Sequence, residues 1–288
     1  MEGTVNRLIR LRDGRSMAYA EYGAPDGFVV VNAHGGLACR LDVEAAHDPA
    51  VEAGIRLISP DRPGVGRSDP DPGRTTFSWA RDVEELLDQI GVERFAVMGW
   101  SMGGQYAAAV GHALPHRVTR VAIVAGALPL TEFGVFDQLP AMDRYFTRMS
   151  QRTPRLAQRC FQVMGLAARV APNLYGRLAA RDLGQADGEV IRREGFATFA
   201  RMSCEAMRQP AGVVQEYCAW MRPWGFQPED LDVPVEIWAG IDDQLVNSSW
   251  PQRLASRIPN ATLNIREGGH FVAHLHYREI FDSLVTGR

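Results

Sequence analysis

The sequence has few cysteines and no large excess of charge of either sign. Its 288 residues include four cysteines, and 31 basic against 34 acidic residues give a formal net charge of −3. The cysteines are scattered and form no CxxC pair, which disfavours a metal site or a redox pair and favours free thiols in a reducing compartment. No basic face is indicated, so nucleic acid is not an expected partner. We expect neither a metal ion nor a cofactor.

The sequence also lacks a long apolar run. No stretch reaches the roughly 18 apolar residues that indicate a membrane-spanning helix. Residues 1–16 carry too many charged side chains to be typical of a secretory signal peptide. We therefore expect a cytoplasmic protein, a monomer or a homodimer, whose partner is a small molecule rather than a membrane.

Short apolar runs alternate with helical patterns on either side of a central stretch. A hairpin is indicated around Asp13 and Gly14, and helical spacing marks residues 76–90 and 271–284. Continuous apolar runs typical of strands buried on both faces occupy residues 28–33, 55–60, 94–99, 120–126, 233–240 and 261–267. This alternation predicts an α/β fold with a mostly parallel central sheet flanked by helices.

The central stretch, residues 131–230, has no buried-strand signal. Helical spacing appears at residues 141–150, 158–170 and 190–207. We therefore predict a core made of residues 1–130 and 231–288, interrupted by a helical insertion at 131–230 that forms a cap, or lid.

A serine stands at the junction of a predicted strand and a predicted helix. The pattern Gly99-Trp100-Ser101-Met102-Gly103 is G-x-S-x-G, preceded by a buried strand and followed by the helix-forming segment QYAAAV. A turn this tight strains the serine backbone and requires glycine on both sides, and it lifts Oγ above the carboxyl edge of the sheet. Ser101 is therefore the candidate nucleophile of a nucleophile elbow.

A serine hydroxyl needs a base, and the base needs an acid that fixes its tautomer. His270 follows a predicted strand and a Gly-Gly turn, so it can reach over the edge of the sheet. Asp242 and Asp243 both follow the strand before it. The distance from Gly240 favours Asp243 as the acid, and a contribution from Asp242 stays open.

A tetrahedral intermediate also needs hydrogen-bond donors for its oxyanion. The amide of Met102 follows the nucleophile, and the glycine-rich loop after residues 28–33 can supply the amide of Gly36. His34 in that loop is expected to brace it rather than act as a second base. Further residues predicted to contact substrate are Gly35, Leu37, Trp100, Phe136, Tyr145, Trp220 and Phe271.

Five ordered motifs, HGG (34–36), DRPGVGRSD (61–69), GWSMGG (99–104), GIDDQLV (240–246) and GGH (268–270), resemble those of the α/β-hydrolase superfamily. The resemblance covers almost the whole chain and is nearest to the cap-bearing branch of esterases, lactonases, C–C bond hydrolases and cofactor-free perhydrolases. It implies a catalytic triad of Ser101, His270 and Asp243, with the amides of Gly36 and Met102 as the oxyanion hole. Leu37 and Asn247 depart from it, because many members carry proline at both positions.

The resulting hypothesis is a serine hydrolase that cleaves a carboxylic ester or lactone through an acyl-enzyme. A C–C bond hydrolase acting on a ring-cleavage diketone would use the same triad. A hydrolase-fold ligand receptor, or a biosynthetic cyclase with low turnover, is a third alternative.

Overall fold

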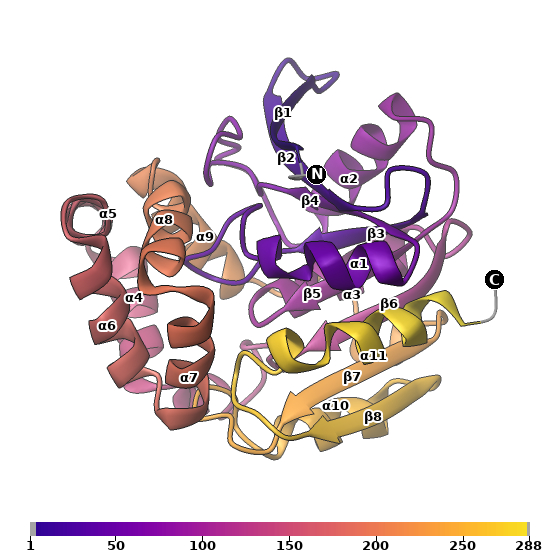
Figure 1. Ribbon diagram of the computed structural model, residues 1–288. Helices are drawn as coiled ribbons and strands as arrows, with labels where there is room; N and C mark the ends of the chain where they lie inside the picture. The colour runs from indigo at the N-terminus through magenta and orange to yellow at the C-terminus, as the bar shows by residue number, and fades with distance from the viewer. Residues whose placement is uncertain (1–3, 287–288) are drawn as a thin grey trace.

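An eight-stranded sheet forms the centre of the computed structural model, which describes residues 4–286 (Figure 1). The spatial order of the strands is β1-β2-β4-β3-β5-β6-β7-β8. The pairs β1–β2 and β2–β4 are antiparallel, and the other neighbouring pairs are parallel. The strands are β1 (Thr4–Arg10), β2 (Ser16–Gly23), β3 (Phe28–Ala33), β4 (Ile55–Pro60), β5 (Phe95–Trp100), β6 (Val118–Val124), β7 (Val235–Gly240) and β8 (Ala261–Arg266).

The burial of each strand follows its place in the sheet. In β3 the run Val29–Ala33 is buried, and its three valines are the apolar, β-branched residues expected where a strand is covered on both faces. The edge strand β8 has no fully buried residue. The mostly parallel sheet that the sequence predicts is therefore confirmed, and its central strand β5 leads directly into the segment that carries Ser101.

Helices cover both faces of the sheet (Figure 1). On one face lie α2 (Ser78–Gln89), α3 (Gly103–Ala113) and α10 (Trp250–Arg257), and on the other lie α1 (His47–Glu52) and α11 (Ala273–Val285). Each side has its own apolar core, centred on side chains such as Trp79 and Tyr106 for the first and Ile280 and Phe281 for the second. No helix within residues 4–286 combines the length and apolar character needed to cross a membrane.

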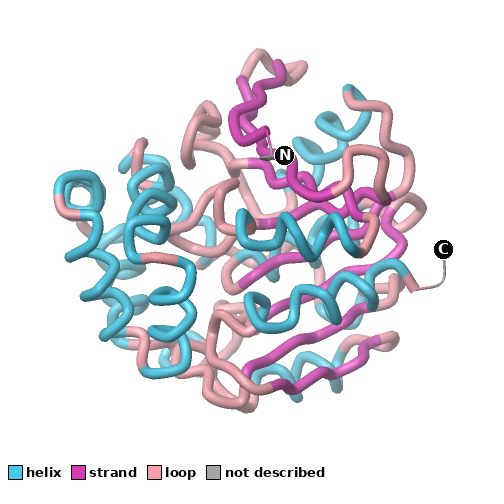
Figure 2. The backbone as a smooth tube through the Cα atoms, in the orientation of Figure 1, coloured by secondary structure: helices cyan, strands magenta, loops and turns pink. Residues whose placement is uncertain are grey.

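The helical insertion, residues 131–230, lies between β6 and β7 in the chain and stands beside one end of the sheet (Figure 2). It contains α4 (Ala141–Arg152), α5 (Pro154–Val170), α6 (Pro172–Asp182), α7 (Gln185–Glu194), α8 (Phe196–Ala206) and α9 (Pro210–Trp220), with single turns at Phe136–Gln138 and Pro228–Asp230; a third such turn, Glu44–Ala46, precedes α1. The prediction of one helix over 190–207 is wrong. Gly195 has φ 100° and divides that stretch into α7 and α8, because helical backbone needs a negative φ.

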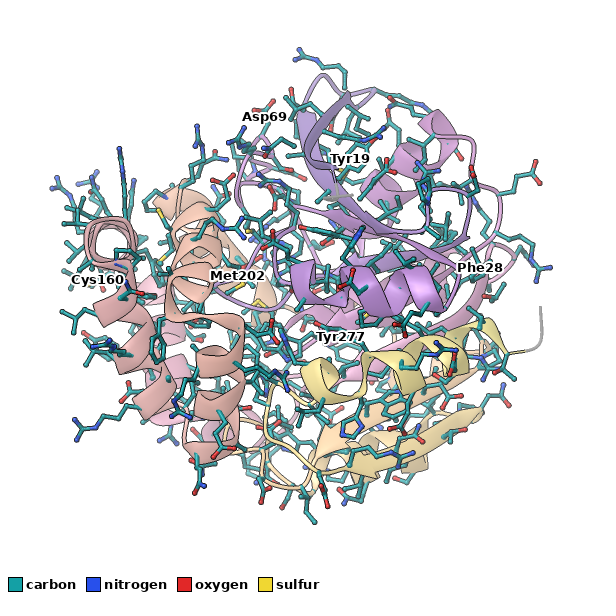
Figure 3. All side chains as sticks on the ribbon, in the orientation of Figure 1. Tyr19, Phe28, Asp69, Cys160, Met202 and Tyr277 are labelled. Carbon is teal, nitrogen blue, oxygen red and sulfur yellow. The ribbon has the colours of Figure 1, made fainter. Side chains whose placement is uncertain are left out.

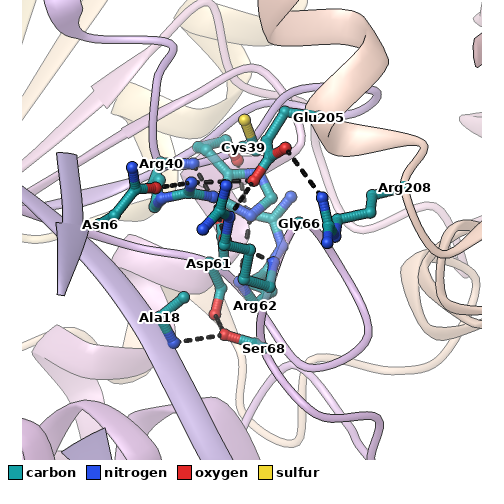
Figure 4. A network of polar contacts seen from close by, with 12 residues as sticks. Asn6, Ala18, Cys39, Arg40, Asp61, Arg62, Gly66, Ser68, Glu205 and Arg208 are labelled. Atoms are coloured by element: carbon teal, nitrogen blue, oxygen red, sulfur yellow. Dashed lines mark hydrogen bonds and ion pairs between the residues drawn. The ribbon is translucent and has the colours of Figure 1, made fainter. Parts of the chain in front are cut away.

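Buried ion pairs join the insertion to the sheet domain (Figure 4). Arg40 is almost wholly buried, and its guanidinium donates to Asp61 at 2.7 Å and to Glu205 of α8 at 2.8 Å. Asp61 also accepts the amides of Arg40 and Arg67, so it anchors the turn that the sequence motif 61–69 indicates. Figure 3 shows Met202 of α8 on the side of the insertion that faces the sheet domain. The carbonyl of Met202 accepts from the Cys39 thiol at 3.6 Å.

Candidate active site

Ser101 occupies a sharp turn between β5 and α3. Its φ is 55°, a left-handed value that is uncommon for a residue with a side chain, and its amide donates to the carbonyl of Val124 at 2.8 Å. A Cβ atom on Gly99 would lie 2.2 Å from the carbonyl oxygen of Gly103, and one on Gly103 would lie 1.9 Å from that of Ala33. Neither position has room for a side chain, which explains the glycines on both sides of the serine.

The structure brings His270 and Asp243 together. His270 Nδ1 lies 3.0 Å from Asp243 Oδ2, and both side chains are buried. The other carboxylate oxygen of Asp243 accepts the amides of Leu245 and Val246 at 2.8 and 3.0 Å. Asp242 is exposed to solvent. Asp243, and not Asp242, therefore contacts the histidine, and the two backbone amides fix the orientation of its carboxylate.

Opposing effects set the pKa values of this pair. Burial lowers the pKa of His270, but the Asp243 carboxylate, with smaller contributions from Asp187 and Asp143, outweighs it and leaves the pKa raised. Burial raises the pKa of Asp243, but the charge of His270 and three hydrogen bonds outweigh it and leave that pKa lowered. Asp243 is therefore ionised at neutral pH, and His270 can accept a proton more readily than a free imidazole.

Ser101 and His270 face one cavity of about 580 Å³. Within residues 4–286, the non-glycine residues with a positive φ are Leu37, Ser101 and Ala125, and all three line this cavity. Strained backbone of this kind persists where the surrounding structure enforces it, and it gathers at functional sites. This coincidence marks the cavity as the candidate active site without reference to any motif.

A loop that follows β3 forms one wall of the cavity. A Cβ atom on Gly36 would lie 3.0 Å from the Met102 side chain, so this loop and the serine turn lie against each other. In the described structure neither the Gly36 amide nor the Met102 amide donates a backbone hydrogen bond. Leu37 has φ 53°, a value that a proline ring forbids, so the loop could not keep this shape with proline at that position.

His34 and Arg62 hold that loop from below. His34 is wholly buried, its Nδ1 contacts the Gly35 carbonyl at 2.9 Å, and its Nε2 accepts the Arg62 amide at 3.1 Å. Burial, together with the nearby arginines, keeps the pKa of His34 well below its ordinary range, so the ring is neutral. The Arg62 guanidinium donates to the carbonyls of His34 and Gly35 and, at 2.8 Å, to Glu216 of α9. His34 thus braces the loop, as the sequence suggests.

Four of the predicted substrate contacts line the cavity, namely Leu37, Trp100, Trp220 and Phe271. The other three, Gly35, Phe136 and Tyr145, do not line it. Gly35 faces the Trp100 ring, since a Cβ atom there would lie 2.5 Å from it. Tyr145 is exposed on the outer side of α4, and Phe136 packs under the guanidinium of Arg148. Trp100 also contacts the backbone of the candidate base, because its Nε1 donates to the His270 carbonyl at 2.8 Å.

Two aspartates of the insertion that the sequence did not single out also reach the site. Asp143 of α4 lines the cavity. Asp187 of α7 is buried, and its two carboxylate oxygens accept the amides of His270 and Phe271 at 3.0 and 2.8 Å. Each stands alone in a helical pattern, and Asp187 lies 83 residues from His270, so no sequence motif marks either of them. Within residues 4–286 no group of three or more His, Cys, Asp or Glu side chains is arranged to hold a metal ion.

Comparison with known proteins identifies the family to which the fold belongs. The family described as "alpha/beta hydrolase fold" matches residues 29–277. The chain belongs to this family. A 2-hydroxy-6-oxononadienedioate/2-hydroxy-6-oxononatrienedioate hydrolase of Paraburkholderia xenovorans (strain LB400) is 32% identical over 99% of this chain and 95% of its own length.

Other relatives of this alpha/beta hydrolase have different names. A non-heme chloroperoxidase of Streptomyces lividans is 32% identical, with 89% of each chain covered. The crystal structure of the enol-lactonase from Burkholderia xenovorans LB400 superimposes with a TM-score of 0.70 at 15% identity, covering 97% of this chain and 98% of that one. At that identity the superposition supports the fold alone. The chain is thus a hydrolase, and its relatives are named for different reactions.

Proposed function

We propose that this alpha/beta hydrolase is a serine hydrolase of carboxylic esters or lactones that works through an acyl-enzyme. The observation that carries the proposal is the contact of His270 Nδ1 with Asp243 Oδ2 at 3.0 Å, on a cavity that also holds Ser101 in a strained turn. The candidate nucleophile, acid and base follow one another along the chain in that order, which is typical of nucleophile-elbow enzymes.

Each group then has one step in the reaction. His270 Nε2 takes the proton from Ser101 Oγ as the serine attacks the ester carbonyl, and the amides of Gly36 and Met102 stabilise the resulting oxyanion. Asp243 holds the imidazole with its proton on Nδ1 and stabilises the imidazolium. His270 next gives its proton to the leaving alcohol. Water, deprotonated by the same imidazole, releases the acid and restores Ser101.

The cavity favours an apolar acyl or alcohol group. Its volume of about 580 Å³ falls within the range of roughly 300–1,000 Å³ usual for small-molecule sites. Its wall away from the triad consists largely of apolar side chains of the insertion, including Phe146, Met164 and Trp220. Such a wall stabilises bound alkyl or aromatic groups through burial of apolar surface.

A C–C bond hydrolase is the second candidate, because the relative from Paraburkholderia xenovorans is named as a 2-hydroxy-6-oxononadienedioate/2-hydroxy-6-oxononatrienedioate hydrolase. The two candidates share the nucleophile, so they are separated by substrate. We expect p-nitrophenyl esters of short to medium acyl chains to be cleaved with a burst of p-nitrophenol, and a 2-hydroxy-6-oxodienoate to be cleaved slowly. The reverse order of kcat/KM would support the C–C bond hydrolase instead.

A fluorophosphonate probe tests the nucleophile directly. The wild-type chain is expected to be labelled at Ser101, and Ser101→Ala is expected to lose both label and esterase activity. Labelling that is the same in both proteins would refute the proposed nucleophile. A labelled wild-type chain that turns over none of the substrates would instead favour a receptor or cyclase of low turnover.

A further inference from the structure

The charges that face the cavity differ from those that a dicarboxylate substrate requires. Asp143 of α4 and Asp182, the last residue of α6, line its wall on the insertion side. Of the described lining residues, His270 alone carries a basic side chain, and it is paired with Asp243. The insertion has many arginines, among them Arg144 and Arg148 of α4, but none lines the cavity.

Asp143 is held in a fixed place beside the reacting groups. Tyr217 of α9 is hydrogen-bonded to it, and the Tyr217 ring is stacked on Phe161 with 5.6 Å between ring centroids and 12° between planes. Burial raises the pKa of Asp143 and outweighs the charge of His270 and the hydrogen bond to Tyr217, which lower it, so that the pKa stays above its ordinary value. The carboxyl group is therefore close enough to His270 for the two charges to interact, in an apolar wall that screens charge poorly.

A fixed acidic group in such a wall discriminates among substrates by charge. A second negative charge brought beside it is disfavoured, because like charges held close together in a desolvated site repel strongly. A neutral chain packs against the apolar wall, and a cation is attracted. The relatives named as nonadienedioate hydrolases are named for a substrate with two carboxylates. This cavity instead presents the carboxyl groups of Asp143 and Asp182, and its one basic residue, His270, is already paired with Asp243.

We propose that Asp143 selects substrates by charge, so that the site takes neutral or amine-bearing esters and rejects those that carry a carboxylate. The proposal rests on the proposed esterase function and names the substrate class of the same site.

Three esters that share a four-carbon acyl chain test it: p-nitrophenyl butyrate, mono-p-nitrophenyl succinate and p-nitrophenyl 4-(trimethylammonio)butyrate. For the wild-type chain we expect kcat/KM for the anionic ester to be at least about 100-fold below that for the neutral ester, as close like charges imply. In Asp143→Asn the anionic-to-neutral ratio should rise at least about tenfold, and the cationic-to-neutral ratio should fall. Asp137→Asn, an exposed carboxylate outside the cavity, should leave both ratios unchanged.

The outcomes separate the two proposals. Failure to cleave even the neutral ester would contradict the esterase function. Cleavage of the neutral and anionic esters at similar rates, or an equal shift of all three substrates in Asp143→Asn, would overturn charge selection by Asp143. If Asp143→Asn does not fold, Asp143→Leu removes the same charge and fills the apolar wall, and the same change in ratios is expected.

A second inference follows from Asp187, independently of the cavity. Its carboxylate accepts two consecutive amides of the loop that carries the candidate base, at 3.0 Å from His270 N and 2.8 Å from Phe271 N. Gly269 packs directly against it, since a Cβ atom there would lie 2.5 Å from Asp187 Oδ1. This is a close contact between the insertion and the loop of His270.

We infer that Asp187 is a positioning residue, through which the insertion fixes the place of His270 relative to Ser101. Charged groups reach His270 from three elements: Asp243 after β7, Asp187 on α7 and Asp143 on α4. Loss of one of these negative charges disfavours the protonated form of His270. Loss of the two hydrogen bonds to Asp187 frees the loop, so that the imidazole ring shifts from its position relative to Ser101.

Asp187→Asn tests this inference, with Glu189→Gln on the exposed side of the same helix as its control. We expect kcat to fall about 10- to 100-fold, the effect of a small misplacement of a catalytic group, with little change in KM. The acidic limb of the kcat/KM profile should also move to lower pH. Gly269→Ala, which would push the carboxylate away, should have the same effects if Asp187→Asn does not fold. An unchanged kcat, or a loss with no movement of the acidic limb, would overturn the positioning role.

Discussion

Replacing Asp243 by asparagine tests the candidate triad most sharply, because the structure determines how the amide would lie. One oxygen of Asp243 accepts two backbone amides, and the other faces His270 Nδ1. In Asp243→Asn the oxygen should keep the two amides and leave the NH₂ group facing the ring. His270 would then accept at Nδ1 and carry its proton on Nε2, where it cannot take the proton of Ser101.

The size of the effect follows from these contacts. Turning the amide over to restore the working tautomer would break two hydrogen bonds at about 1 kcal/mol each, or roughly 30-fold in rate. Loss of the charge-assisted bond to the imidazolium removes about 3 kcal/mol, or roughly 150-fold. Together they predict a fall in kcat on the order of 10³–10⁴, similar to the effect of the same change in serine proteases.

The assay is steady-state hydrolysis of a neutral p-nitrophenyl ester, with thermal unfolding to verify that the variant is folded. The matched control is Asp242→Asn, an exposed neighbour, for which we expect a change of no more than about twofold, as for most surface substitutions. Equal and mild losses in the two variants would refute the reasoning, because they would mean that neither carboxylate orients the base.

Three further predictions concern the glycines, the buried ion pairs and pH. Gly103→Ala, whose Cβ would lie 1.9 Å from the Ala33 oxygen, should cost about 3 kcal/mol or more of unfolding free energy in urea, while Gly73→Ala in an exposed turn should cost little. Glu216→Gln removes the carboxylate charge 2.8 Å from the buried Arg62 guanidinium and should lower the free energy of unfolding by about 3–5 kcal/mol. Glu229→Gln in an exposed pair should lower it by about 1 kcal/mol or less, and similar losses in the two variants would contradict the burial argument. Because the base must be neutral and the pKa of His270 is raised, kcat/KM should rise with pH through an apparent pKa above the ordinary histidine value of about 6.5, and a lower midpoint would contradict this.

Much of the fold could be predicted because its strands are distinct in the sequence. The continuous apolar runs give the bounds of β3 and β4, since burial on both faces removes any alternation. The apolar run 120–126 predicts the end of β6 two residues too late, because Ala125 turns the chain out of the strand with φ 47°. Ala125 lines the cavity, and the residues next to it in the sequence do not indicate a positive φ at an alanine.

The candidate site could also be predicted only in part from the sequence. Ser101, Asp243 and His270 follow strands at one edge of the sheet, and short local motifs identify them. The cavity wall depends instead on which side of each insertion helix faces inward. In α4 the exposed Tyr145 and the cavity-lining Asp143 are two positions apart, so only the packing of α4 against α5 and α9 decides between them. Sequence therefore indicates the reaction better than the substrate.

The two proposed roles, charge selection by Asp143 and positioning of His270 by Asp187, both depend on the same segment of the chain. Asp143 on α4 and Asp187 on α7 belong to the same helical insertion, one facing the cavity and the other fastened to the loop of His270. Buried ion pairs from Arg40 and Arg62 fix α8 and α9 to the sheet domain. An insertion anchored at these points has little freedom to open as a rigid unit without disturbing His270. We therefore expect substrates to enter beside α4 and α6, where Met142, Leu178 and Asp182 border the cavity and are exposed, rather than by movement of the whole insertion.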